Sequence, residues 1–143
     1  MEQQYSYQKQ LRPLVLLRYS IGIIYIWFGA LKFFHGYSPA EQLATNTIGK
    51  LTFGLVPENV SILLLATWEF VLGLAFLYGR WMKTLLVFLF VHLACTFTPL
   101  LFFPGESFKH APYGFTLVGQ YIMKNLILVS AGMVLWQYSP PKK

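Results

Sequence analysis

One carboxylate, one imidazole and two lysines lie inside stretches of this sequence that are otherwise apolar: Glu69, His92, Lys32 and Lys124. A charged group at the centre of a bilayer costs about 2.5–3.5 kcal/mol on insertion scales, so these side chains should face a protein interior or a wet cavity. The carboxylate and the imidazole can exchange protons, and the lysines can hold an anion or a carbonyl oxygen. Together these groups predict a polar site inside an apolar protein.

Helical spacing adds two more polar residues to the candidates. At roughly 100° per residue, Arg18 and Lys32 fall on one stripe of a helix with Gly22 and Gly29, and Gln120 lies one turn before a lysine. Small residues on such a stripe allow helices to approach closely. The candidate catalytic residues are Glu69 and His92, and the candidate ligand-binding residues are Arg18, Lys32, Gln120 and Lys124.

The elements that position these residues are four apolar runs. The 143 residues are 56% hydrophobic and 11% charged, far from the roughly 25% charged of soluble proteins. Each run is close to the roughly 20 residues that a helix needs to cross a bilayer, and none has the alternation of a β-barrel. We therefore predict a single all-α domain over residues 1–143, an integral membrane four-helix bundle. The predicted spans are 14–34, 60–79, 84–103 and 117–137.

The segments between the spans differ in character. Pro13 suits the first turn of the first helix, because proline lacks the N–H that this position leaves unpaired. Segment 37–59 has spaced apolar residues and predicts one or two short helices on the outer surface. Segment 104–116 is rich in proline and glycine and predicts an irregular loop.

The distribution of charge predicts the orientation. The formal net charge is +6, but the cations flank the predicted spans instead of forming a stripe, which argues against a nucleic-acid partner. One side carries Lys9, Arg12, Arg80, Lys83, Lys142 and Lys143. The other side carries Lys50 and Lys109, offset by Glu41, Glu58 and Glu106. The positive-inside rule then places both termini in the cytoplasm.

This topology brings the polar residues toward one cavity. Glu69 and His92 fall near the midplane, while Lys32 and Lys124 fall in the outer half, so the four could line a cavity that opens outward. A net positive cavity attracts a small oxyanion or the carbonyl oxygens of a quinone. Two other interpretations stay open: Lys32 extends to the interface, or Glu69 forms a structural ion pair with Lys32 or Lys124.

A metal site is not expected. His92 and Cys95 share a helix face, but two ligands fall short of the four that zinc normally takes. Cys95 is also the single cysteine, so the chain has no internal disulfide.

Three stretches resemble DoxX-like membrane proteins. LLRYSIGIIYIWFGALKFF (16–34) is similar to the first helix of that family, and TWEFVLGLAFLYGRW (67–81) is similar to the second. FTLVGQYIMKNLILVSAG (115–132) resembles the last helix of related reactive-chlorine-resistance membrane proteins. The resemblance implies a four-helix protein of the bacterial inner membrane, in a family that includes small subunits of thiosulfate:quinone oxidoreductases. It singles out Arg18, Lys32, Glu69, Arg80 and Lys124.

Two functions follow as hypotheses. The first is a redox-linked subunit that binds a quinone or a small oxyanion, with the bilayer and another membrane protein or a second copy as partners. The second is a non-enzymatic anchor or assembly partner, in which Glu69 pairs with a lysine to hold the bundle together. The ligand and the partner protein are not specified by the residues.

Overall fold

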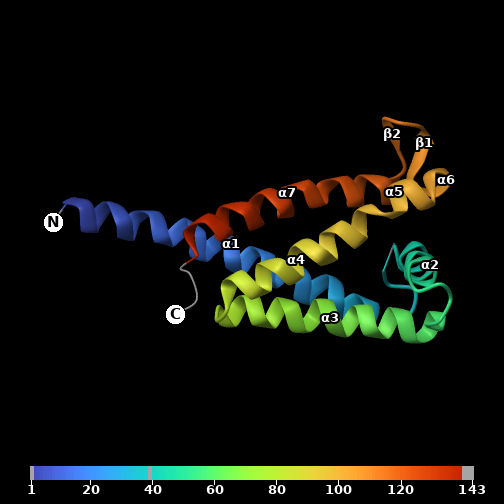
Figure 1. Ribbon diagram of the computed structural model, residues 1–143, viewed down its shortest axis with the longest axis horizontal. Helices are drawn as coiled ribbons and strands as arrows, with labels where there is room; N and C mark the ends of the chain where they lie inside the picture. The colour runs from blue at the N-terminus through green and yellow to red at the C-terminus, as the bar shows by residue number, and fades with distance from the viewer. Residues whose placement is uncertain (1, 39, 140–143) are drawn as a thin grey trace.

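The chain folds as an elongated bundle of helices (Figure 1). The computed structural model describes residues 2–38 and 40–139, so Lys142 and Lys143, which entered the charge count, lie outside the described residues. The elements are α1 (Glu2–Lys32), α2 (Glu41–Leu51), α3 (Glu58–Tyr78), α4 (Met82–Phe97), α5 (Pro99–Phe102), α6 (Pro104–Ser107), β1 (Phe108–His110), β2 (Gly114–Phe115) and α7 (Leu117–Tyr138).

Within the described part of the chain, four helical stretches are long and apolar enough to cross a membrane: Arg12–Lys32, Glu58–Tyr78, Met82–Phe102 and Leu117–Tyr138. They match the four predicted spans to within a few residues at each end. This is the pattern of a multi-pass membrane protein with a mostly helical fold. The third stretch is interrupted at Thr98, where α4 gives way to α5 because Pro99 has no N–H to continue the helical ladder.

Two predictions about the connecting segments were wrong. The first helix does not begin at Pro13 but at Glu2, and its N-terminal part projects past the other helices (Figure 1). The added residues include Glu, Gln and Lys, which are good helix formers, and the single proline does not end the helix. Segment 104–116 is not irregular, since it forms α6 and a small antiparallel hairpin of β1 and β2. Phe108 pairs with Phe115 in that hairpin, and their rings lie 4.9 Å apart.

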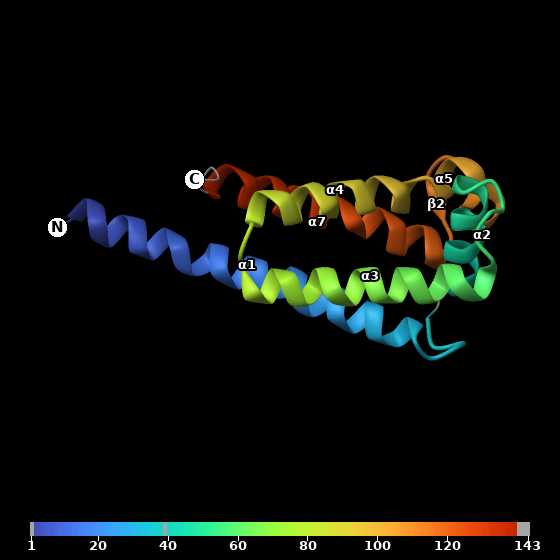
Figure 2. The same cartoon turned by 60° about the horizontal axis from the view of Figure 1, so that its bottom comes forward.

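The long helices pack as two pairs, with α4 and α7 lying over α1 and α3 (Figure 2). Glycines allow α1 to contact the backbone of α3. A Cβ atom on Gly73 would lie 2.7 Å from both the Gly22 carbonyl oxygen and the Ile26 nitrogen, and one on Gly29 would lie 2.7 Å from the Phe70 nitrogen. Such close contact between small residues is the usual means by which helices associate in a membrane.

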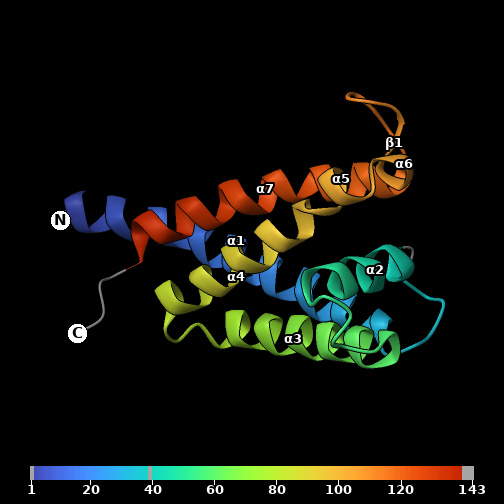
Figure 3. The same ribbon diagram turned by 45° about the vertical axis from the view of Figure 1, so that its right-hand side comes forward.

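The packed core occupies the half of the bundle nearest the turn between α3 and α4. Ile21, Phe76 and Leu86 are fully buried there, and Leu135 of α7 closes the same cluster. The opposite end is built differently, because α2 lies beside the first part of α3 and contacts α5 (Figure 3). Thus the bundle has a close-packed core toward one end, and short elements cover the long helices at the other end.

The turn between α3 and α4 depends on a left-handed residue. Gly79 ends α3 with φ 78°, and its N–H donates to the Ala75 carbonyl. Glycine is favoured at this position because a positive φ is energetically unfavourable for residues that have a Cβ atom. Arg18 of α1 packs its guanidinium directly on Gly79, which fixes the level of α1 relative to the end of α3.

Replacing Gly79 with alanine should lower the free energy of unfolding by about 1–2 kcal/mol, the cost of a left-handed conformation for an L-residue. Because the guanidinium of Arg18 can move aside, most of the lost stability comes from the left-handed backbone conformation at residue 79. Asparagine tolerates this conformation better, so Gly79→Asn should lose less. Unfolding in mixed micelles, followed by tryptophan fluorescence, measures both variants. Equal stabilities for alanine, asparagine and glycine would contradict this role for the turn.

Candidate functional site

Glu69 and Lys32 form a buried ion pair between α3 and α1. The Lys32 Nζ lies 2.5 Å from Glu69 Oε2, and the two side chains are only 9% and 10% exposed. The same ammonium donates to the Phe28 carbonyl oxygen at 3.3 Å. Gly29 makes this pairing feasible, because a Cβ atom there would lie 3.1 Å from the Cβ of Glu69. Close approach of the two helices therefore sets the position of the ion pair.

His92 of α4 completes the cluster on the other oxygen of the carboxylate. Its Nε2 lies 3.5 Å from Glu69 Oε1, and its ring meets the edge of Tyr25 with centroids 5.4 Å apart. Glu69 thus contacts α1 through one oxygen and α4 through the other. A carboxylate placed between an ammonium and an imidazole can accept a proton from one partner and pass it to the other.

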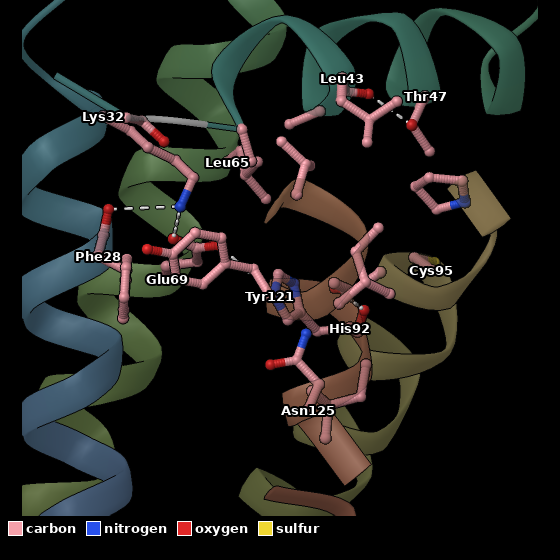
Figure 4. A pocket seen from close by; sticks show the side chains of 18 of the residues that line it. Phe28, Lys32, Leu43, Thr47, Leu65, Glu69, His92, Cys95, Tyr121 and Asn125 are labelled. Atoms are coloured by element: carbon pink, nitrogen blue, oxygen red, sulfur yellow. Dashed lines mark hydrogen bonds and ion pairs between the residues drawn. The ribbon is translucent and has the colours of Figure 1, made fainter. Parts of the chain in front are cut away.

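These three residues lie on the wall of a cavity of about 670 Å³. The cavity sits between the two helix pairs, beyond the packed core, and α2 contributes part of its wall through Leu43 and Thr47 (Figure 4). Its lining is mainly apolar, with the charged cluster concentrated at one side. A volume of this size and a few convergent polar groups are typical of a small-molecule site.

The wall also contains polar groups that were not among the predicted site residues. Tyr121 and Asn125 extend from α7 into the same space, and Thr47 enters from α2 (Figure 4). Thr47 donates to the Leu43 carbonyl oxygen, which leaves its oxygen available as an acceptor. Asn125 adjoins a predicted lysine, so helical spacing could have suggested it. No pattern in the sequence indicated that α2 would contact the cavity.

The predicted site residues divide into three groups. Lys32, Glu69 and His92 come together as described, and the lysine that pairs with Glu69 is Lys32. The Lys32 side chain is only 9% exposed and extends across the bundle to Glu69. Lys124 lines the same cavity, but it is exposed and its Nζ lies 5.0 Å from the centre of the Tyr121 ring.

Arg18 and Gln120 do not take part in this site. Gln120 is exposed on α7 and is not part of the cavity wall. Arg18 lies at the opposite end, against Gly79, because it precedes Lys32 by 14 residues, about 21 Å along a helix. Sharing a helix face with Lys32 therefore does not bring Arg18 to the cavity.

Among the residues that the structure describes, no three His, Cys, Asp or Glu side chains gather as a set of metal ligands. Cys95 is a free thiol on the cavity wall.

The fold and the site define a helical bundle of the multi-pass membrane type, with a Lys–Glu–His cluster on the wall of an apolar cavity. No protein-family model, curated protein or solved structure matches this chain.

Proposed function

We propose that this chain is a DoxX-like membrane protein that acts as a redox-linked subunit and binds a quinone in its cavity. The observation that carries the proposal is the Lys32–Glu69–His92 cluster on the wall of an otherwise apolar space of about 670 Å³. The order of the polar residues along the chain, which resembles that family, supports it as well.

The balance of charge favours a quinone over a small oxyanion. Lys32 is already paired with a carboxylate at 2.5 Å, so the cluster has little net positive charge. Lys124, which would supply the excess charge, is exposed and lies against an aromatic ring. A neutral carbonyl oxygen needs only a hydrogen-bond donor, and the Lys32 ammonium or the His92 imidazole can provide one.

The walls of the cavity also suit a ligand that arrives from the bilayer. On one side, α2 covers the cavity with Leu43 and Thr47. On the other side, Phe28 of α1 and Ile127 of α7 line the cavity and are 42% and 71% exposed. Because these apolar side chains are exposed at the edge of the cavity, they would contact the apolar tail of a quinone.

A bound quinone would supply two-electron chemistry coupled to the uptake or release of two protons. The residues of this chain would hold a carbonyl oxygen and manage the protons. Lys32 orients the carboxylate of Glu69, which lies within reach of both the Lys32 ammonium and the His92 imidazole. The His92 Nε2 lies 3.5 Å from Glu69 Oε1, so these two groups would exchange a proton with each other. The electrons would come from, or go to, a partner protein.

The location belongs to the same proposal. The end that carries Arg12, Arg80 and Lys83 would face the cytoplasm of a bacterium. The end with α2 and the hairpin, where Glu41, Glu58 and Glu106 offset the cations, would face outward. Both termini would then be cytoplasmic and the cavity would lie toward the outer leaflet of the inner membrane.

One observation favours the alternative, a membrane anchor or assembly partner. Phe53 and Leu55, between α2 and α3, are 93% and 84% exposed, and Tyr113 in the β1–β2 hairpin is 82% exposed. Large apolar side chains at the end of a bundle are suited to contact with another protein. In that case the Lys32–Glu69 pair would serve the stability of the bundle alone.

A short-tailed ubiquinone titrated onto the detergent-solubilised protein tests the proposal. A buried carbonyl oxygen that loses its donor costs about 1–3 kcal/mol, so His92→Phe should weaken binding about fivefold or more. His110→Phe is the matched control, because His110 is exposed in β1 and outside the cavity. Equal binding by the wild type and both variants, or no saturable binding by the wild type, would reject the quinone site.

A further inference from the structure

Arg18 is a charged residue that the cavity does not use. Its guanidinium packs on Gly79, so Arg18 is level with the turn where α3 ends and α4 begins. Two apolar stretches, Glu58–Tyr78 and Met82–Phe102, meet at that turn. Arg18 therefore lies where spanning helices reach the lipid headgroups, although ten or more apolar residues follow it along α1.

Two more cations, Arg80 and Lys83, lie at the same end of the bundle, and each contacts an aromatic ring. The Arg80 Cζ lies 5.9 Å from the centre of the Tyr78 ring and 5.6 Å from that of Trp81, and the Lys83 Nζ lies 5.7 Å from that of Trp136. The Arg18 Cζ lies 4.8 Å from the centre of the Tyr19 ring. Contact with a ring fixes a cation in place but leaves most of its N–H groups free for another partner.

None of these three cations has an acidic partner in the described part of the chain. The carboxylates that the structure places belong to other regions: Glu41 opens α2, Glu58 opens α3, Glu69 lies in the cavity and Glu106 lies in α6. The buried Nε of Arg18 has no hydrogen-bond acceptor among the described residues. Thus no carboxylate among the side chains that the structure describes compensates these three positive charges, which lie at one level of the bundle.

We propose that Arg18, Arg80 and Lys83 form a binding site for the phosphate of an anionic phospholipid. The planar guanidinium donates two parallel hydrogen bonds to a phosphate, which suits the two arginines, and the lysine adds a point charge. Trp81 and Tyr78, which are 69% and 70% exposed, supply the amphipathic rings that favour the headgroup layer. The lipid tails lie along the apolar surface of the spans below. The site is independent of any ligand in the cavity.

Native mass spectrometry of the delipidated full chain tests this site. The protein is titrated with phosphatidylglycerol or with phosphatidylcholine of the same acyl chains. Each cation near an anionic lipid contributes about 1 kcal/mol, so Arg80→Gln and Lys83→Gln should each weaken phosphatidylglycerol binding about fivefold. Binding of phosphatidylcholine, whose choline cancels the charge of the phosphate, should be weaker in the wild type and change little.

Lys109→Gln is the matched control, since it removes one exposed cation from β1 at the other end of the bundle. It should bind phosphatidylglycerol as the wild type does. The proposal is overturned by equal binding of the two lipids, by equal losses in Lys109→Gln and Arg80→Gln, or by inorganic phosphate displacing the lipid at millimolar concentration. Arg80 and Lys83 carry the test because Arg18 packs on Gly79 and its replacement could disturb folding.

Discussion

Replacement of Lys32 by methionine is expected to lower the free energy of unfolding by about 3–5 kcal/mol, the range measured when one partner of a buried ion pair is removed. The pair is buried on both sides, and the Lys32 ammonium is the partner at 2.5 Å from the carboxylate. Methionine keeps the volume of the side chain but leaves Glu69 in an apolar cavity with only His92 beside it. Unfolding in mixed micelles, followed by tryptophan fluorescence, measures the loss.

Two further variants make this result specific to the pair. Lys124→Met removes a lysine that lines the same cavity but is exposed, so its cost should stay near that of an ordinary surface change, about 0.5 kcal/mol. The double variant Lys32→Met/Glu69→Met removes both charges and should recover most of the loss. A Lys32→Met protein as stable as Lys124→Met would show that the pair is not the one that stabilises the bundle.

Gly73→Ala should separate α1 from α3 and destabilise the protein by about 1–3 kcal/mol, the cost of overpacking a close-packed interface. The added methyl group would lie 2.7 Å from two backbone atoms of α1, the Gly22 oxygen and the Ile26 nitrogen. Neither atom can move without the whole helix. Since Gly29 and Lys32 lie further along the same interface, the variant should also weaken the contact of Lys32 with Glu69.

Gly49→Ala is the matched control for this interface. Gly49 lies in α2, and a methyl group there would meet nothing within 4 Å. Alanine in an exposed helix is favoured over glycine by about 0.5–1 kcal/mol, so this variant should be neutral or slightly stabilised. If both alanine variants unfold like the wild type, the close approach of α1 and α3 does not determine stability.

The spans and the need for a cation beside Glu69 could be predicted because each depends on local sequence. The length of an apolar run fixes a spanning helix, and the repeat of Gly22, Gly29 and Lys32 on one face indicates which side of α1 meets a neighbour. The cost of a lone carboxylate in an apolar run then requires a cation near Glu69.

The remaining features depend on how whole helices lie against each other. Lys32 rather than Lys124 reaches Glu69 because α1 contacts the backbone of α3. The distance between two helices cannot be deduced from the sequence of either helix alone. Arg18 packs on Gly79 because of the level at which α1 crosses α3, which the stripe of α1 does not specify, and the start of α1 at Glu2 was missed. The place of α2 on the cavity wall follows from tertiary packing, since an 11-residue amphipathic helix does not reveal what covers its apolar face.

A quinone in the cavity can be detected by extracting the protein from lipid nanodiscs and identifying the small molecules that accompany it by mass spectrometry. We expect about one quinone per chain in the wild type, and Glu69→Gln should lose most of it. Glu58→Gln, which changes an exposed carboxylate at the start of α3, should retain it. A folded wild type that carries no quinone, or equal amounts of quinone in all three proteins, would show that the cavity is not a quinone site and would favour an anchoring role.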